Sequence, residues 1–157
     1  MSETVQNCII LFGLSMVPVV ELRGAIPAGI AMGISPMVTW LISVVGNMVP
    51  VPFIILFIRA IFEWIKKRGG FPCQIVEHME EKADKNSTLF YRYELLGLCI
   101  LVAIPLPGTG AWTGALVAAM LRLRMRSAIP AIGIGVCIAG IIMLVLSCGV
   151  GFVFNNI

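Results

Sequence analysis

Four long stretches of the sequence contain no charged residue, and short polar segments separate them. The uncharged stretches are residues 4–20, 24–58, 95–121 and 127–157. The hydrocarbon core of a bilayer is about 30 Å thick and requires around 20 apolar residues in a helix. Residues 36–62 and residues 127–154 are long enough and have no strong interruption. The pattern therefore predicts two membrane-spanning helices there.

The other two apolar regions are each interrupted near the middle. Residues 5–33 contain two charged residues followed by a glycine and a proline, namely Glu21, Arg23, Gly24 and Pro27. Residues 95–121 contain Pro105-Leu106-Pro107-Gly108-Thr109-Gly110. Each interruption leaves two pieces of about 10–16 residues, which are too short to cross a bilayer singly. Each region is therefore either one kinked span or a re-entrant hairpin that turns back at mid-membrane.

The basic residues favour the hairpins. Ten of the eleven are Arg59, Lys66, Lys67, Arg68, Lys82, Lys85, Arg92, Arg122, Arg124 and Arg126. Cytoplasmic loops are enriched in Lys and Arg, so the linker 63–94 is expected in the cytoplasm. With two hairpins, all ten basic residues lie on that side and both termini lie outside. With four simple spans, Arg122, Arg124 and Arg126 would be external.

We therefore predict an all-α integral membrane protein, a single membrane domain over residues 1–157. It is expected to be an inverted repeat of a re-entrant helical hairpin followed by a transmembrane helix, since each such unit crosses the membrane an odd number of times. Its parts are repeat 1 (4–62), the cytoplasmic linker (63–94) and repeat 2 (95–155).

A weak internal similarity accompanies this layout. Residues 20–24 align with residues 104–108 at an offset of 84, and a one-residue shift then aligns Gly29 with Gly114. Short hydrophobic segments interrupted by Gly and Pro at corresponding positions of two halves indicate a transporter binding site.

Composition narrows the function classes. Of the 157 residues, 59% are hydrophobic and 12% are charged, whereas soluble domains carry about 25% charged residues. This excludes a soluble enzyme, a nucleic-acid binder and a secreted disulfide scaffold. The five cysteines form no Cys-x-x-Cys pair and His78 is the only histidine, so no metal site or cofactor is expected.

Glu21 and Arg23 are the only ionisable residues well inside an apolar region. Charges in the membrane are costly, so they are candidates for function. Two positions apart, they would not face each other on a regular helix. Gly24 and Pro27 favour an unwound backbone there, with Pro27 in the first turn of a new half-helix. Because such backbone is tolerated only against protein or water, a polar pocket near the midplane is predicted.

The second interruption is expected to complete this pocket. Thr109 is predicted to cap a half-helix that begins near Ala111. Helix N-termini and glycine-rich segments attract anions, so together with Arg23 they suit a phosphate or carboxylate. The predicted substrate-binding residues are Arg23, Gly24, Pro27, Pro107, Gly108, Thr109, Gly110, Trp112 and Thr113.

Glu21 has a separate predicted role. Desolvation favours a neutral carboxyl group, whereas a nearby guanidinium favours the carboxylate. If desolvation prevails, Glu21 binds and releases a proton and couples transport to the proton gradient. The alternative is that Glu21 and Arg23 only neutralise each other and fix the hairpin. Two hairpins and two spans form a thin wall around a polar cavity, so a homodimer is expected.

The two motifs resemble those of a known family. Residues 21–27 (Glu-Leu-Arg-Gly-Ala-Ile-Pro) and 105–112 (Pro-Leu-Pro-Gly-Thr-Gly-Ala-Trp) are similar to the putative small multidrug export proteins of bacteria and archaea. The resemblance covers nearly the whole chain and implies export of small drug-like solutes.

The layout is also similar to the DedA membrane proteins. These are implicated in moving lipid phosphates such as undecaprenyl phosphate and in proton-dependent drug resistance. The chain departs from their pattern because it is shorter and has prolines in the second tip in place of a charged pair.

These observations predict a non-enzymatic, multi-pass protein of the cytoplasmic membrane. It is expected to be a secondary transporter for a small amphipathic or phosphate-bearing substrate. The alternative is a non-transporting scaffold or assembly factor whose hairpins only anchor the linker. An intramembrane enzyme is disfavoured because the apolar regions contain no nucleophile–base pair.

Overall fold

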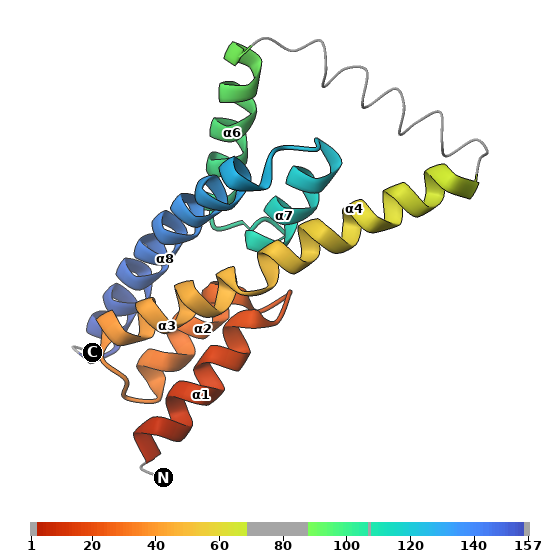
Figure 1. Cartoon of the computed structure of the whole chain (residues 1–157). Coiled ribbons are helices and arrows are strands. Elements are labelled where there is room, and N and C mark those ends of the chain that lie inside the picture. The colour runs from red at the N-terminus through yellow and green to blue at the C-terminus, as the bar shows by residue number, and fades with distance from the viewer. Residues whose placement is uncertain (1–2, 69–87, 107, 156–157) are drawn as a thin grey trace.

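The computed structural model describes residues 3–68, 88–106 and 108–155, and the described secondary structure is entirely helical (Figure 1). The helices are α1 (Glu3–Met16), α2 (Glu21–Ala31), α3 (Pro36–Met48), α4 (Pro50–Arg68), α6 (Thr88–Ala103), α7 (Ala111–Met120) and α8 (Met125–Asn155). This confirms the all-α class.

Among the described residues, two helical segments are long and apolar enough to cross a membrane, Pro36–Ile65 and Met125–Gly149. They closely match the two spans predicted from the sequence. The first consists of α3 and most of α4, which are separated only at Val49. Pro50 follows directly, and proline has no N–H group to continue the helical hydrogen bonds.

The first interruption lies earlier in the chain than predicted. The break covers residues 17–20, and α2 begins at Glu21. Pro18 explains the position, because proline disfavours helix at the residue before it and cannot donate a hydrogen bond. The prediction of an unwound segment around Gly24, with Pro27 in the first turn of a new helix, is therefore wrong. Both residues lie within α2.

The second interruption is where the sequence placed it, between α6 and α7, and α7 begins at Ala111 as expected. α4 continues to Arg68 and α6 already begins at Thr88. Both helices thus extend into the predicted linker 63–94. Its remaining part, residues 69–87, lies outside the described residues.

The two halves of the chain share a backbone feature after their second helices. The α2–α3 and α7–α8 connections have the same set of three backbone hydrogen bonds, each bond in the first having a counterpart 89 residues later. Each connection also holds one residue in the left-handed region, Gly33 (φ +77°) and Arg122 (φ +51°). At these connections the halves are therefore related by an offset of 89 residues, whereas the alignment made from the sequence used an offset of 84.

The same offset relates two buried glycines of the long helices, Gly46 in α3 and Gly135 in α8. A Cβ added at Gly46 would lie 2.9 Å from the carbonyl oxygen of Phe12 in α1. A Cβ added at Gly135 would lie 2.7 Å from the carbonyl oxygen of Cys99 in α6. Small residues allow helix backbones to approach closely in this way. In both halves, glycine therefore permits tight packing of the first helix on the long helix.

The second helix of each half also packs on a long helix of the other half. α1 packs on α2 and α3, and α6 packs on α7 and α8, whereas α2 also packs on α8 and α7 packs on α4 (Figure 1). The shared core is formed by apolar residues of these crossing helices, among them Leu22, Ile26, Val51, Ile55, Ala115, Ala118, Ile132 and Val136. The packing of α2 on α8 and of α7 on α4 brings the two breaks together.

Candidate functional site

A pocket of about 470 Å³ lies where the two breaks meet. It is lined from the first break and the start of α2, from the second break and the start of α7, and from α8. The lining residues are Pro18, Val19, Glu21, Arg23, Pro105, Gly108, Thr109, Thr113 and Met143. Residues separated by more than 80 positions thus form one cavity.

Arg23 connects α2 to the second break. Its Nη2 donates to Thr109 Oγ1 at 2.7 Å and to the carbonyl oxygen of Ile104 at 3.3 Å. Thr109 Oγ1 also lies 2.8 Å from that carbonyl oxygen and 2.9 Å from the carbonyl oxygen of Leu106. A hydroxyl can accept from Arg23 while donating its own proton to one of these carbonyls. Thr109 therefore holds Arg23 in place, and it does not cap α7 as predicted.

Glu21 occupies the N-terminus of α7. Its Oε1 accepts a hydrogen bond from the backbone N–H of Trp112 at 3.2 Å, and the residue is only 5% exposed. A carboxylate is favourable at this position because helix N-termini carry unpaired N–H groups and a partial positive charge. The sequence predicted that this helix terminus would attract an anionic substrate group. The group that lies there is the Glu21 carboxyl group, a side chain of the protein itself.

Gly110 makes room for that carboxylate. It is the residue before α7 and has φ +147°, a conformation that other residues rarely adopt. A Cβ at this position would overlap the Glu21 carboxyl group. Gly108 has φ +86°, and its carbonyl oxygen accepts a hydrogen bond from Thr113 Oγ1 at 2.8 Å. The two glycines thus shape the second break around Glu21.

Three further predicted residues, Trp112, Gly24 and Pro27, do not line the pocket. Trp112 Nε1 donates to the carbonyl oxygen of Met16 at 3.2 Å, which joins α7 to the end of α1. Gly24 faces the Val20 side chain within the first turn of α2, and Pro27 is exposed on that helix. Pro107 lies outside the described residues.

The sequence reasoning missed the apolar part of the lining. Pro18 and Val19 come from the first break, and Val19 is 91% exposed. Met143 comes from α8. The sequence signal for this lining was the Val-Pro-Val-Val segment at residues 17–20, directly before Glu21, because its proline marks the break in the helix. The pocket is therefore amphipathic, with Arg23 and Thr109 beside hydrocarbon groups.

A buried polar stripe on α3 was also missed. Thr39, Ser43 and Asn47 are fully buried, and they recur every four residues within an apolar run. Such spacing places them on one face of a helix. Within the part of the chain that the structure describes, the Ser43 hydroxyl and both amide atoms of Asn47 have no hydrogen-bond partner. The corresponding residues of α8, at the offset of 89, are the buried apolar Ala128, Ile132 and Val136.

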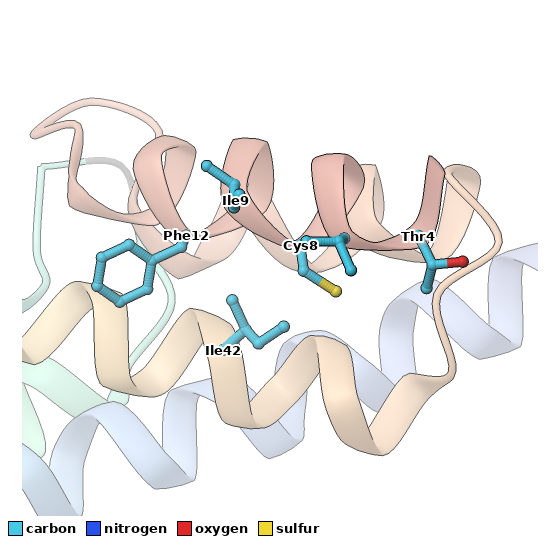
Figure 2. A pocket seen from close by; sticks show the side chains of 6 residues that line it. Thr4, Cys8, Ile9, Phe12 and Ile42 are labelled. Atoms are coloured by element: carbon cyan, nitrogen blue, oxygen red, sulfur yellow. The ribbon is translucent and has the colours of Figure 1, made fainter. Parts of the chain in front are cut away.

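A second cavity, of about 360 Å³, contrasts with the site between the breaks. It lies between α1 and α3 and is lined by Thr4, Val5, Cys8, Ile9, Phe12 and Ile42 (Figure 2). Its exposed wall is entirely apolar. Its lining contains no charged side chain, whereas Glu21 and Arg23 line the pocket between the breaks.

No group of three metal-ligating side chains (His, Cys, Asp or Glu) occurs among residues 3–68, 88–106 and 108–155. The charged chemistry of the pocket therefore rests on Glu21 and Arg23.

The profile of a family described as "Putative small multi-drug export protein" matches residues 21–142, which is well over half of the chain. The match begins at Glu21, directly after the first break, and extends through the second break into α8. Neither the comparison with curated proteins nor that with solved structures gives a match. With its two apolar spans, the chain is a membrane protein, and it belongs to the small multi-drug export protein family.

Proposed function

We propose that the protein is a secondary transporter that moves a small amphipathic or phosphate-bearing substrate through the pocket between the two breaks. The observation that carries this proposal is a cavity of about 470 Å³ that is lined from both halves and contains Arg23. Ligand sites usually have volumes of about 300–1,000 Å³, with few polar groups among apolar ones. The pocket has both properties.

The charges in the pocket favour an anionic substrate. Glu21 is nearly covered and its carboxylate accepts the N–H of Trp112. Arg23 is only partly buried, and both of its hydrogen bonds within the described residues come from Nη2. A guanidinium has five N–H donors and binds phosphate and carboxylate groups well. Pro18, Val19 and Met143 would contact the apolar part of the substrate. A lipid-linked phosphate such as undecaprenyl phosphate combines both features.

Glu21 is the proposed proton-coupling group. As a carboxylate it is attracted to the N-terminus of α7 and to Arg23, so it holds the two halves together at the pocket. Protonation would remove the charge and weaken this link. A cycle in which Glu21 is protonated and deprotonated would therefore open and close the contact between the breaks.

The proposed membrane arrangement is an inverted repeat of re-entrant hairpins with the linker in the cytoplasm and both termini outside. The helices α1, α2, α6 and α7 have 14, 11, 16 and 10 residues. Each is shorter than the about 20 residues that a crossing requires, which supports a turn within the membrane. The shared backbone structure at the offset of 89 supports the repeat. We further propose a homodimer, in which a second copy thickens the wall around the pocket.

Transport from proteoliposomes tests the substrate class. Vesicles that contain the protein are loaded with carboxyfluorescein, an amphipathic anion, or with ethidium, an amphipathic cation. Efflux of the anion that Arg23→Ala abolishes and Arg126→Ala leaves unchanged would support the proposal. Cation efflux that needs only Glu21 would overturn the anionic assignment. Glu21→Gln should remove the pH dependence of efflux.

The scaffold alternative makes the opposite prediction. In that case, the double variant Glu21→Ala/Arg23→Ala would keep its cellular phenotype, whereas deletion of residues 69–87 would abolish it.

The membrane arrangement is tested separately by cysteine labelling. Single cysteines at positions 34, 109, 124 and 157 are introduced into a variant without native cysteines. Re-entrant hairpins predict that position 124 is labelled from the cytoplasm and position 157 from outside. Four simple spans predict the reverse.

A further inference from the structure

A separate pocket of about 250 Å³ lies at the opposite end of α7 from the breaks. It is lined by Arg59, Phe62 and Glu63 of α4 and by Arg122 of the α7–α8 connection. The ten residues of α7 span about 15 Å, so this pocket is distinct from the one at Arg23. Neither the predicted transport site nor the family description assigns it a role.

Arg59 is fixed in this pocket by the α7–α8 connection. Its Nη2 donates to the carbonyl oxygen of Leu123, which follows the end of α7 at Met120. Its Nε is buried and has no hydrogen-bond partner within the described part of the chain. A buried donor of a charged group without a partner is costly. The guanidinium is thus held in place while one of its donors remains unsatisfied.

Arg122 occupies a position that suits glycine. Its φ of +51° lies in the left-handed region, which is disfavoured for residues with a side chain. The equivalent connection in the first half has the same hydrogen bonds and uses Gly33 there. The backbone therefore does not require arginine at this position. Because the residue lines the pocket, its strained conformation indicates that the side chain serves a purpose.

The pocket lies beside lipid-facing surface. Phe62 and Glu63 are close to the end of the candidate span Pro36–Ile65. Apolar side chains on the neighbouring surfaces of α4 and α7 are exposed, among them Leu56, Phe57, Leu116 and Met120. The lining itself has two positive side chains and one negative side chain, so it is positively charged. A ligand for this pocket would combine a negative group with a hydrocarbon part.

We propose that this pocket binds the phosphate group of an anionic phospholipid at the membrane interface. The phosphate would accept hydrogen bonds from the guanidinium groups of Arg59 and Arg122, which both line the pocket, and arginine suits phosphate well. The acyl chains would lie against the exposed apolar residues of α4 and α7. Basic pockets between membrane helices bind lipid headgroups in this manner.

The experiment compares the thermal stability of the purified full-length protein in nanodiscs of phosphatidylcholine with and without phosphatidylglycerol. We expect phosphatidylglycerol to raise the Tm of the wild type by several degrees. Arg122→Gly, a change that the left-handed backbone at this position accommodates, should lose more than half of the response to phosphatidylglycerol. Arg126→Ala, which changes an exposed arginine outside the pocket, should keep the full response.

Two results would overturn the proposal. One is an Arg122→Gly variant that responds to phosphatidylglycerol as strongly as the wild type, or a wild type that does not respond. The other comes from adding inorganic phosphate to phosphatidylcholine nanodiscs. If phosphate alone raises the Tm as much as the lipid does, the pocket binds free phosphate and not a lipid headgroup.

Discussion

The two breaks of this protein supply different chemistry to one pocket. The first break is followed by Glu21 and Arg23, which contribute charged side chains. The second contributes backbone N–H groups, the Thr109 hydroxyl and the space left by Gly110. Glu21 and Gly110 are equivalent positions at the offset of 89, yet one carries a carboxylate and the other has no side chain. The two halves of the chain thus contribute complementary groups to one pocket.

The long helices show the same division. Thr39, Ser43 and Asn47 form a polar stripe on α3, whereas their counterparts on α8 are apolar. At the connections before the long helices, the second half carries the polar residue, because Arg122 occupies the position equivalent to Gly33 of the first half. The shared backbone structure therefore identifies equivalent positions in the two halves, but the side chains at these positions differ in polarity and charge.

The largest expected effect comes from Gly110→Ala, which tests the fit between the two breaks. The added Cβ overlaps the Glu21 carboxyl group and the backbone is left-handed. Strain of 1–3 kcal/mol and loss of a buried hydrogen bond lead us to expect a destabilisation of about 3 kcal/mol. The measurement is thermal unfolding in detergent.

Two controls accompany this variant. Gly97→Ala in α6 places its Cβ in open space and should be neutral or slightly stabilising. The double variant Gly110→Ala/Glu21→Ala should be less stable than Glu21→Ala alone only by the backbone strain at residue 110, about 1–3 kcal/mol, because the overlap with the carboxyl group is then absent. A double variant that shows the full sum of both losses would mean that the two residues do not compete for the same space.

Thr109→Val should have a smaller effect. The change leaves the Arg23 guanidinium without its 2.7 Å partner, and hydrogen bonds to charged groups contribute about 1.5–3 kcal/mol. Thr113→Val, which removes a bond between uncharged groups, should cost only about 1 kcal/mol. Equal losses in unfolding measurements of the two variants would show that Arg23 is not held by Thr109.

Asn47→Leu should stabilise the protein by about 1 kcal/mol, because it removes buried amide atoms that have no partner. The reciprocal change in the second half, Val136→Asn, should destabilise it by a similar or larger amount. Destabilisation by Asn47→Leu would indicate that the amide is hydrogen-bonded in the membrane.

The sequence predicted the parts of this architecture that depend on composition and on proline. The lengths of the uncharged runs located both spans to within a few residues, and Pro105 and the following glycines located the second break. The sequence also identified Glu21, Arg23 and Thr109 as partners in one pocket, because a charge in an apolar run requires a polar partner.

Other features depend on contacts that a linear pattern does not contain. The first break lies at Pro18 and not at Gly24, because glycine and proline are tolerated within α2 once that helix packs on α3 and α8. The capping of α7 by Glu21 joins residues 91 positions apart, and no local signal distinguishes it from capping by Thr109. The equivalence of Gly33 and Arg122 is visible only in the backbone.

The most direct test of the central claim, that the joined breaks form the substrate site, is labelling of Thr113→Cys in a variant without native cysteines. Residue 113 lines the pocket but is not a charged partner of the substrate. We expect a negatively charged methanethiosulfonate reagent to modify it, at a rate that falls when the transported anion is added and when Arg23 is changed to Ala. A cysteine that reacts at the same rate in all three conditions would contradict the account.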